Sequence, residues 1–144
     1  MAVDVVSPGE IVTALRAGFP MTQVYYHSSH KSDEDIRYAL EQGVGYFVID
    51  NTEELLAVER IAAQLQRRQD VLIRLTPGID PHTYEAVATG KVDSKFGFAI
   101  ETGQAEEITR YALELRHVRL VGFHSHVGSQ VFDSDVFLQT VDIV

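Results

Sequence analysis

Short apolar runs rich in Val, Ile, Phe and Tyr alternate along this chain with segments whose apolar residues recur at helical spacing. The short runs cover residues 3–6, 24–27, 46–50, 71–75 and 118–123. Between them we expect helices over about 9–17, 33–43, 51–65 and 103–115, with a last helix beginning near 133 or 134. Strands that are apolar on both faces and alternate with helices form parallel sheets. The pattern therefore predicts the α/β class, as either an open doubly wound sheet or a (β/α)8 barrel.

Helix-ending and helix-starting residues stand at the expected boundaries. Gly18 and Gly43 are suited to end the first two helices, and Ser32 precedes three acidic residues that favour a helix start. Asn51 followed by Glu54 predicts a capping box. The residues expected to face the core are Ile11, Val12, Ala14, Leu15, Leu55, Val58, Ile61, Ala62, Leu65, Ile108, Tyr111, Ala112 and Leu115.

A barrel is favoured over an open sheet by spacing and by a missing motif. The early strands recur every roughly 22 to 25 residues, which suits a barrel. No Gly-rich dinucleotide fingerprint follows the first strand. A complete barrel needs about 250 residues, so we expect the 144 residues to form part of one, truncated at both ends. The segment 76–98 is too long for an ordinary connection and is expected to be functional.

Composition excludes several classes of function. The chain has no cysteine, which removes disulfides, zinc thiolate sites and cysteine nucleophiles. Its net charge of -9 disfavours a nucleic-acid partner. No apolar run is long enough for a membrane span, and no signal region opens the chain. We expect a cytoplasmic protein.

Polar residues gather where the predicted strands end, which is where barrels place their active sites. They are Asp4, Ser7, His27, Asp50, Arg74, His124, His126 and Ser129. Freed amides at Gly128 and the Ser129 hydroxyl are suited to hold a phosphate oxygen. A histidine of this segment, His124 or His126, is suited either to stack on a flat aromatic cofactor or to pack and form a hydrogen bond. We expect no metal here, because no carboxylate lies near the two histidines before Asp133.

Several charged residues lie in apolar or glycine-rich surroundings, where their role needs an explanation. Arg74 lies within an apolar strand, so it must either join an ion pair or bind an anion or phenolate. Asp4 on the first strand raises the same question. Lys91 and Lys95 are expected to be solvated surface residues, and we assign neither as a Schiff-base nucleophile.

Six short motifs follow one another along the chain: residues 4–10 (DVVSPGE), 27–32 (HSSHKS), 49–51 (IDN), His82 with 89–90 (TG), 94–97 (SKFG) and 126–130 (HVGSQ). In this order they resemble the motifs of the alanine-racemase-like barrels of the ornithine and diaminopimelate decarboxylases. Pro8 stands where the family usually has Gly, and 27–32 differs from the usual pattern at three positions. Gln130 favours the diaminopimelate branch.

The resemblance implies a cofactor and a set of roles. The cofactor would be pyridoxal 5'-phosphate, with His126 on its ring, Ser129 on its phosphate, and Arg74 and Asp4 near the ring substituents. The chain would form strands 2 to 6 of the barrel as one domain over 1–144, with the C-terminal β domain absent. The family's Schiff-base lysine lies on the strand before Asp4, so no catalytic residue is assigned in this chain, and we expect it to be inactive alone.

The implied reaction is the decarboxylation of meso-2,6-diaminopimelate to L-lysine, the last step of lysine biosynthesis, by a homodimer acting on a small amino-acid substrate. Two alternatives stay open. One is a decarboxylase for another basic amino acid, namely arginine, ornithine or carboxynorspermidine. The other is a non-catalytic half-barrel.

Overall fold

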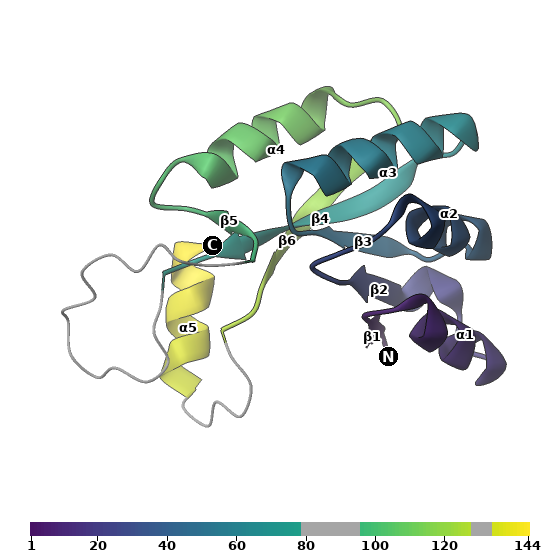
Figure 1. Cartoon of the computed structure of the whole chain (residues 1–144). Helices are drawn as coiled ribbons and strands as arrows, with labels where there is room; N and C mark the ends of the chain where they lie inside the picture. Colours follow the sequence, from purple (N-terminus) through teal and green to yellow (C-terminus); the bar gives the residue numbers. More distant parts are fainter. Residues whose placement is uncertain (79–95, 128–133) are drawn as a thin grey trace.

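The computed structural model describes residues 1–78, 96–127 and 134–144 as a succession of βα units (Figure 1). The strands are β1 (Val3–Val5), β2 (Val24–His27), β3 (Tyr46–Ile49), β4 (Gln69–Thr76), β5 (Phe98–Ala99) and β6 (Val118–Ser125). The helices are α1 (Pro8–Arg16), a short 3-10 turn η1 (Met21–Gln23), α2 (Asp33–Gln42), α3 (Thr52–Gln64), α4 (Gln104–Glu114) and α5 (Ser134–Ile143). Every predicted strand and helix is present within a few residues of its expected bounds. The two-residue strand β5, inside the expected long loop, was not predicted.

All strand pairs in the sheet are parallel. Each of β1 to β4 pairs with the next strand in the chain, and β6 lies beside β4. β5 pairs with the last two residues of β4. In Figure 1, α1, α2 and α3 lie side by side along one face of this sheet, and α4 follows β5. Sequential parallel strands with helices on the outside form a partial (β/α)8 barrel, as predicted.

The helix boundaries follow from local capping. The Ser7 hydroxyl accepts from the Glu10 amide with Pro8 in the first turn, and Ser32 forms a full capping box with Asp35. Gly43 ends α2 with a φ of 78°, a conformation that glycine adopts without strain. Asn51 caps α3 through the Glu54 amide, as predicted.

The reciprocal half of the capping box predicted at Asn51 is not formed. The Glu54 side chain instead accepts from the Asp50 amide and from Lys31, and it is buried. The capping prediction was wrong on this point because a buried cation competes for the carboxylate.

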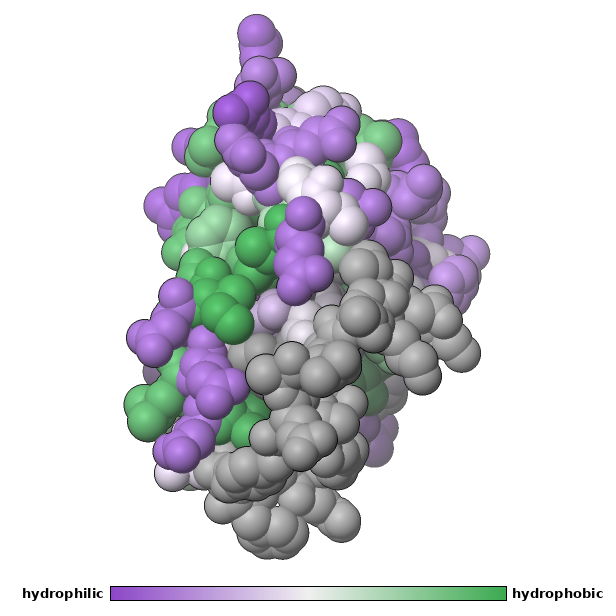
Figure 2. All heavy atoms as spheres, turned by 90° about the vertical axis from the view of Figure 1, so that its left-hand side faces the viewer, coloured by the Kyte–Doolittle hydropathy of each residue, from purple (hydrophilic) through white to green (hydrophobic). Residues whose placement is uncertain are grey.

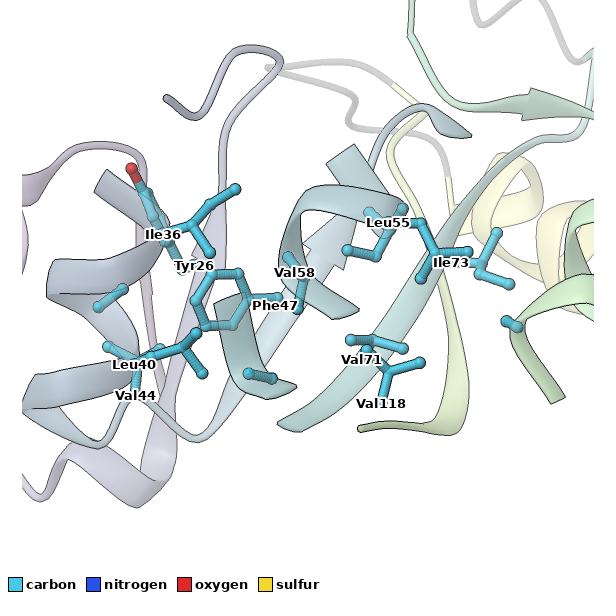
Figure 3. Packing of buried hydrophobic residues seen from close by; sticks show 14 of the residues in the cluster. Tyr26, Ile36, Leu40, Val44, Phe47, Leu55, Val58, Val71, Ile73 and Val118 are labelled. Carbon is cyan, nitrogen blue, oxygen red and sulfur yellow. The ribbon is translucent and has the colours of Figure 1, made fainter. Parts of the chain in front are cut away.

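The hydrophobic core lies between the sheet and its helices (Figure 3). Tyr26, Phe47 and Ile73 project from the strands and meet Ile36, Leu40, Leu55 and Val58 from α2 and α3. Most of the predicted core residues are buried, but Val12, Leu15, Leu65 and Leu115 are only partly so. Tyr111 is wrong as a core residue, since 38% of it is exposed.

The opposite face of the sheet, here called the inner face, is largely polar. Side chains alternate between the two faces of a strand, so neighbours of the core residues point inward. The polar residues at inner-face positions are Asp4, Tyr25, His27, Tyr46, Asp70, Arg74, Arg119 and His124. The expectation of strands apolar on both faces is therefore wrong, because this face carries ionic and hydrogen-bonding groups that a packed barrel core would exclude.

A register shift in β6 turns His124 toward this face. Val71 pairs with Leu120 and Leu72 pairs with Gly122, so Val121 is the extra residue of a β-bulge. After the bulge, His124 lies directly opposite Arg74. The bulge thus brings an imidazole beside the arginine.

Apolar side chains also lie exposed on β6 and α5. They are Val121, Phe123, Phe137, Leu138, Val141 and Ile143, and the exposed Val144 follows α5. Figure 2, which views the left-hand side of Figure 1, shows hydrophobic residues at the surface between hydrophilic ones. Within the described residues, every helix falls short of the length and hydropathy needed to cross a bilayer.

Candidate cofactor site

Four polar side chains from neighbouring strands meet at the carboxyl ends of the sheet. His27 ends β2, Asp50 follows β3, and Arg74 and His124 are paired residues of β4 and β6. Parallel strands bring their carboxyl ends to one edge, which is why residues far apart in sequence converge. We call His27, Asp50, Arg74 and His124 the rim cluster.

Arg74 is the centre of the rim cluster and is only 9% exposed. Its Nη1 donates to Asp50 Oδ1 over 3.0 Å and contacts His27 Nε2 at 3.1 Å. Its guanidinium carbon lies 5.0 Å from the centre of the Phe96 ring, a cation–π distance. The sequence required either an ion-pair partner or a bound anion for this arginine, and Asp50 is that ion-pair partner.

The surroundings of both histidines of the rim cluster lower their pKa and so favour the neutral ring. Burial, followed by the nearby His124, Arg74 and Lys31, lowers the pKa of His27 to about 4. Burial and the Arg74 charge likewise lower the pKa of His124, against the opposing effect of Asp4. The two rings lie 4.9 Å apart, centre to centre. Burial disfavours the charged form of both rings, and the positive charge of Arg74 acts in the same direction.

Two further predicted site residues, Asp4 and His126, are described by the structure. Asp4 is exposed on β1, and its charge acts on His124. His126 is exposed just after β6. Gly128 and Ser129 lie outside the described residues, as do Lys91 and Lys95, so the predicted phosphate contact stays a prediction. Across residues 1–78, 96–127 and 134–144, no group of three side chains is placed to hold a metal ion.

A second buried ion pair lies on the helix side of the sheet. Lys31 Nζ donates to Glu54 Oε1 at 2.5 Å, to the Ser28 carbonyl at 2.8 Å and to the Val48 carbonyl at 3.0 Å. The same ammonium lies 5.2 Å from the centre of the Tyr26 ring, which faces the helices. Burial lowers the pKa of Lys31 and raises that of Glu54. Sequence reasoning missed this pair, since Glu54 also suits a helix cap and Lys31 lies in a polar loop.

Ionic and imidazole groups held at the carboxyl ends of parallel strands are the arrangement by which βα barrels bind and transform small molecules. The class of protein is therefore a barrel with a ligand site at this rim.

Comparison with known proteins identifies the family. All 144 residues match the family model described as "Pyridoxal-dependent decarboxylase, pyridoxal binding domain". The chain is 42% identical over 138 residues to the diaminopimelate decarboxylase of Bacillus subtilis (strain 168), a match that covers 96% of this chain and 31% of that protein. It is 41% identical over 144 residues to that of Staphylococcus aureus (strain COL), covering 100% of this chain and 34% of the relative.

Solved structures agree with the sequence comparison. The diaminopimelate decarboxylase of M. jannaschii in complex with L-lysine superposes with a TM-score of 0.88 at 32% identity, over 99% of this chain and 33% of that one. The chain belongs to the pyridoxal-dependent decarboxylases, and its residues match the model of their pyridoxal-binding domain. It spans about a third of the length of the relatives it matches.

Two features of the rim cluster fit a pyridoxal group. His124 Nδ1 is buried and has no hydrogen-bond partner among the described residues, an arrangement that costs stability unless a ligand or water supplies one. Arg74 beside it provides the cation that a phenolate oxygen or a carboxylate requires.

Proposed function

We propose that these residues seat pyridoxal 5'-phosphate for the decarboxylation of meso-2,6-diaminopimelate to L-lysine. One observation carries the proposal. Arg74, held by Asp50 and His27, lies at the rim where barrels bind ligands. Beside it, the buried Nδ1 of His124 has no hydrogen-bond partner among the described residues. All 144 residues of the chain that carries this cluster match the model of a pyridoxal-binding domain.

Four residues are proposed to contact different parts of the cofactor. His126 stacks on the pyridoxal ring and Ser129 contacts the phosphate. Arg74 and Asp4 lie near the ring substituents, where the guanidinium suits an anionic oxygen. The proximity of Asp4 to His124, expressed in the pKa of the imidazole, supports a common site for these groups.

The bound pyridoxal would supply the electron sink that accepts the bonding pair released as carbon dioxide departs. The chain's own residues orient the reactants and fix the charge around them. Neutral His27 and His124 add no positive charge beside Arg74, so the guanidinium and its carboxylate set the local potential. Because the lysine that forms the Schiff base is expected before Asp4, we expect these 144 residues alone to bind the cofactor without turnover.

A direct test is equilibrium binding of pyridoxal 5'-phosphate to the purified chain, followed by borohydride reduction and mass spectrometry. We expect saturable binding that is weakened by His126→Leu and Arg74→Met. A matched control is Arg110→Met, on the exposed face of α4. We expect no specific labelling of Lys31, because its ammonium is fully hydrogen bonded. Absence of saturable binding would overturn the proposed role.

The substrate is proposed from the relatives. The first curated matches are diaminopimelate decarboxylases, and the M. jannaschii structure holds L-lysine. A chimera in which this chain replaces the matching segment of the B. subtilis enzyme tests the assignment. We expect release of L-lysine from meso-diaminopimelate and no turnover of ornithine, arginine or carboxynorspermidine. Turnover of one of those amino acids instead would favour the alternative decarboxylases.

Homodimeric assembly and a cytoplasmic location are part of the same proposal. Light scattering of the active chimera tests the first, with two copies per particle expected. Cell fractionation tests the second.

A further inference from the structure

Hydrogen-bond geometry at Arg74 determines the chemical form of the neighbouring histidine. A guanidinium has only donors and keeps its charge in proteins. The atom 3.1 Å from Arg74 Nη1 is His27 Nε2, so Nε2 must be the acceptor. An imidazole whose Nε2 accepts carries its proton on Nδ1 and is neutral. The contact therefore fixes both the tautomer and the charge of His27.

The same contact restrains the guanidinium. Nη1 carries two hydrogens, and its hydrogen-bond partners among the described residues are Asp50 Oδ1 at 3.0 Å and His27 Nε2 at 3.1 Å. The acceptors come from two different strands, β2 and the end of β3, so together they define the plane and rotation of the group. Asp50 alone, through one oxygen, leaves rotation about the bond between Cζ and Nε available.

Other groups packed around Arg74 limit where its side chain can go. The Phe96 ring covers the guanidinium, and a Cβ at Gly97 would lie 2.8 Å from the Arg74 carbonyl oxygen and 3.0 Å from its Cγ. Gly97 also has a φ of 73°, which favours glycine. The arginine is thus enclosed on the loop side, and His27 is the acceptor on the β2 side.

We propose that His27 is a positioning residue, which as the neutral Nδ1–H tautomer accepts from Arg74 Nη1 and holds the guanidinium toward the cofactor position. The role toward the cofactor rests on the proposed function. The orientation of Arg74 does not.

The experiment measures the tautomer and the guanidinium motion directly by NMR of the isotopically labelled chain. Long-range nitrogen–proton correlations report which His27 nitrogen is protonated, and the two terminal nitrogens of Arg74 give separate signals only while rotation about the bond between Nε and Cζ is slow. We expect the Nδ1–H form and two separate signals in the wild type. His27→Leu removes the acceptor and should speed the rotation by about tenfold or more. His27→Gln, whose amide oxygen reaches the Nε2 position, should restore slow rotation.

Exposed His30 provides the matched control, and His30→Leu should leave both signals unchanged. An Nε2–H tautomer in the wild type, or slow rotation that survives in His27→Leu, would overturn the proposal. If His27→Leu does not fold, the wild-type tautomer and the His27→Gln spectrum still decide it.

Titration of the same variants with pyridoxal 5'-phosphate separates this inference from the proposed function. We expect affinity to fall in His27→Leu and to recover in His27→Gln. Faster rotation with unchanged affinity would refute the positioning role while the wild type still binds. Failure of the wild type to bind would refute the proposed function, leaving the NMR result to decide the orientation of Arg74.

Discussion

Two buried ion pairs lie on opposite faces of the same sheet, and they differ in how completely their cations are satisfied. Lys31 has three N–H donors and meets three oxygens, from Glu54, Ser28 and Val48. Arg74 has five N–H donors. In the described part of the chain, its side-chain hydrogen bonds leave from Nη1 alone, toward Asp50 and His27.

This difference separates a structural cation from a ligand-binding one. Lys31 has no donor left, and its charge is enclosed between β2, β3 and the first turn of α3. Arg74 lies at the carboxyl rim beside a histidine nitrogen without a described partner. A buried charge by itself is thus a poor sign of function, and the count of unused donors is a better one.

The two pairs are also connected. Glu54 Oε1 receives Lys31, while Oε2 accepts from the Asp50 amide at 3.3 Å. Asp50 in turn holds Arg74. Glu54 of the helix-side pair therefore helps to hold Asp50 in place, and Asp50 fixes Arg74 on the inner face.

The largest expected effect is on stability, from breaking the helix-side pair. Lys31→Met leaves Glu54 buried and unpaired, and should lower the free energy of unfolding by about 3–5 kcal/mol. Urea denaturation measures this loss. The double variant Lys31→Met, Glu54→Leu should recover most of it, because it removes the unpaired charge.

The surface pair between Arg110 and Glu106 is the control for this measurement. Both side chains are at least 70% exposed, so Arg110→Met should cost about 0.5 kcal/mol or less. If Lys31→Met lowered the free energy of unfolding by as little as that, Glu54 would be readily solvated. The distinction between a structural cation on the helix side and a ligand-binding cation on the inner face would then be wrong.

The second expected effect is on cofactor binding, from the inner-face cation. Arg74→Met should weaken pyridoxal 5'-phosphate by about 10- to 100-fold, the loss expected for a hydrogen bond to a charged group. Its stability loss should be smaller than that of Lys31→Met, about 1–3 kcal/mol, because fewer hydrogen bonds are broken. Equilibrium dialysis measures the first quantity and urea denaturation the second. If Arg74→Met lost more stability than Lys31→Met, Arg74 would be the structural cation, contrary to the assignment given above.

Sequence reasoning was most successful where the deciding interactions are local. The caps at Ser32 and Gly43 and the strand order follow from nearest neighbours and hydrophobic spacing, and the ordered motifs led to the correct family. Arg74 was identified as a residue that must be paired or bound to an anion. Its partner was not predictable, because Asp50 lies 24 positions away and meets it only through strand pairing.

The failures arise from tertiary competition. Glu54 suits a helix cap by spacing, yet a buried lysine from another loop takes its carboxylate. Tyr111 has the spacing of a core residue, but it lies exposed on α4. The bulge at Val121, which turns His124 toward Arg74, is marked in the sequence of β6 only by the neighbouring Gly122, and a single glycine does not predict which residue is displaced.

The third expected effect is a pH dependence on the inner face. The pKa of His27 is about 4 in the fold against an ordinary value of 6.5. Between these values the unfolded chain binds more protons, so the free energy of unfolding falls as pH is lowered from 6.5 toward 4. His27→Gln cannot titrate, whereas His124, Asp50, Lys31 and Arg74, which surround the ring, are present in both proteins.

The measurement is urea denaturation of wild type and His27→Gln at several pH values across this window. The stability of the wild type relative to the variant should decrease steadily as the solution is acidified, and should be constant above the ordinary histidine pKa. A difference that does not change with pH would mean that His27 accepts a proton as easily in the fold as in the unfolded chain, contrary to its contact with Arg74.

The smallest expected effect concerns the aromatic ring above each cation. Phe96→Leu keeps an apolar cover on Arg74 but removes the ring face, and should cost about 0.5–1 kcal/mol because the ring is 44% exposed. Tyr26→Leu on the helix side should cost more, since Tyr26 is 1% exposed and its ring also fills the core. Urea denaturation ranks the two. Equal losses would mean that the ring over Arg74 is as much a part of the packed core as the ring over Lys31, and that both cations are structural.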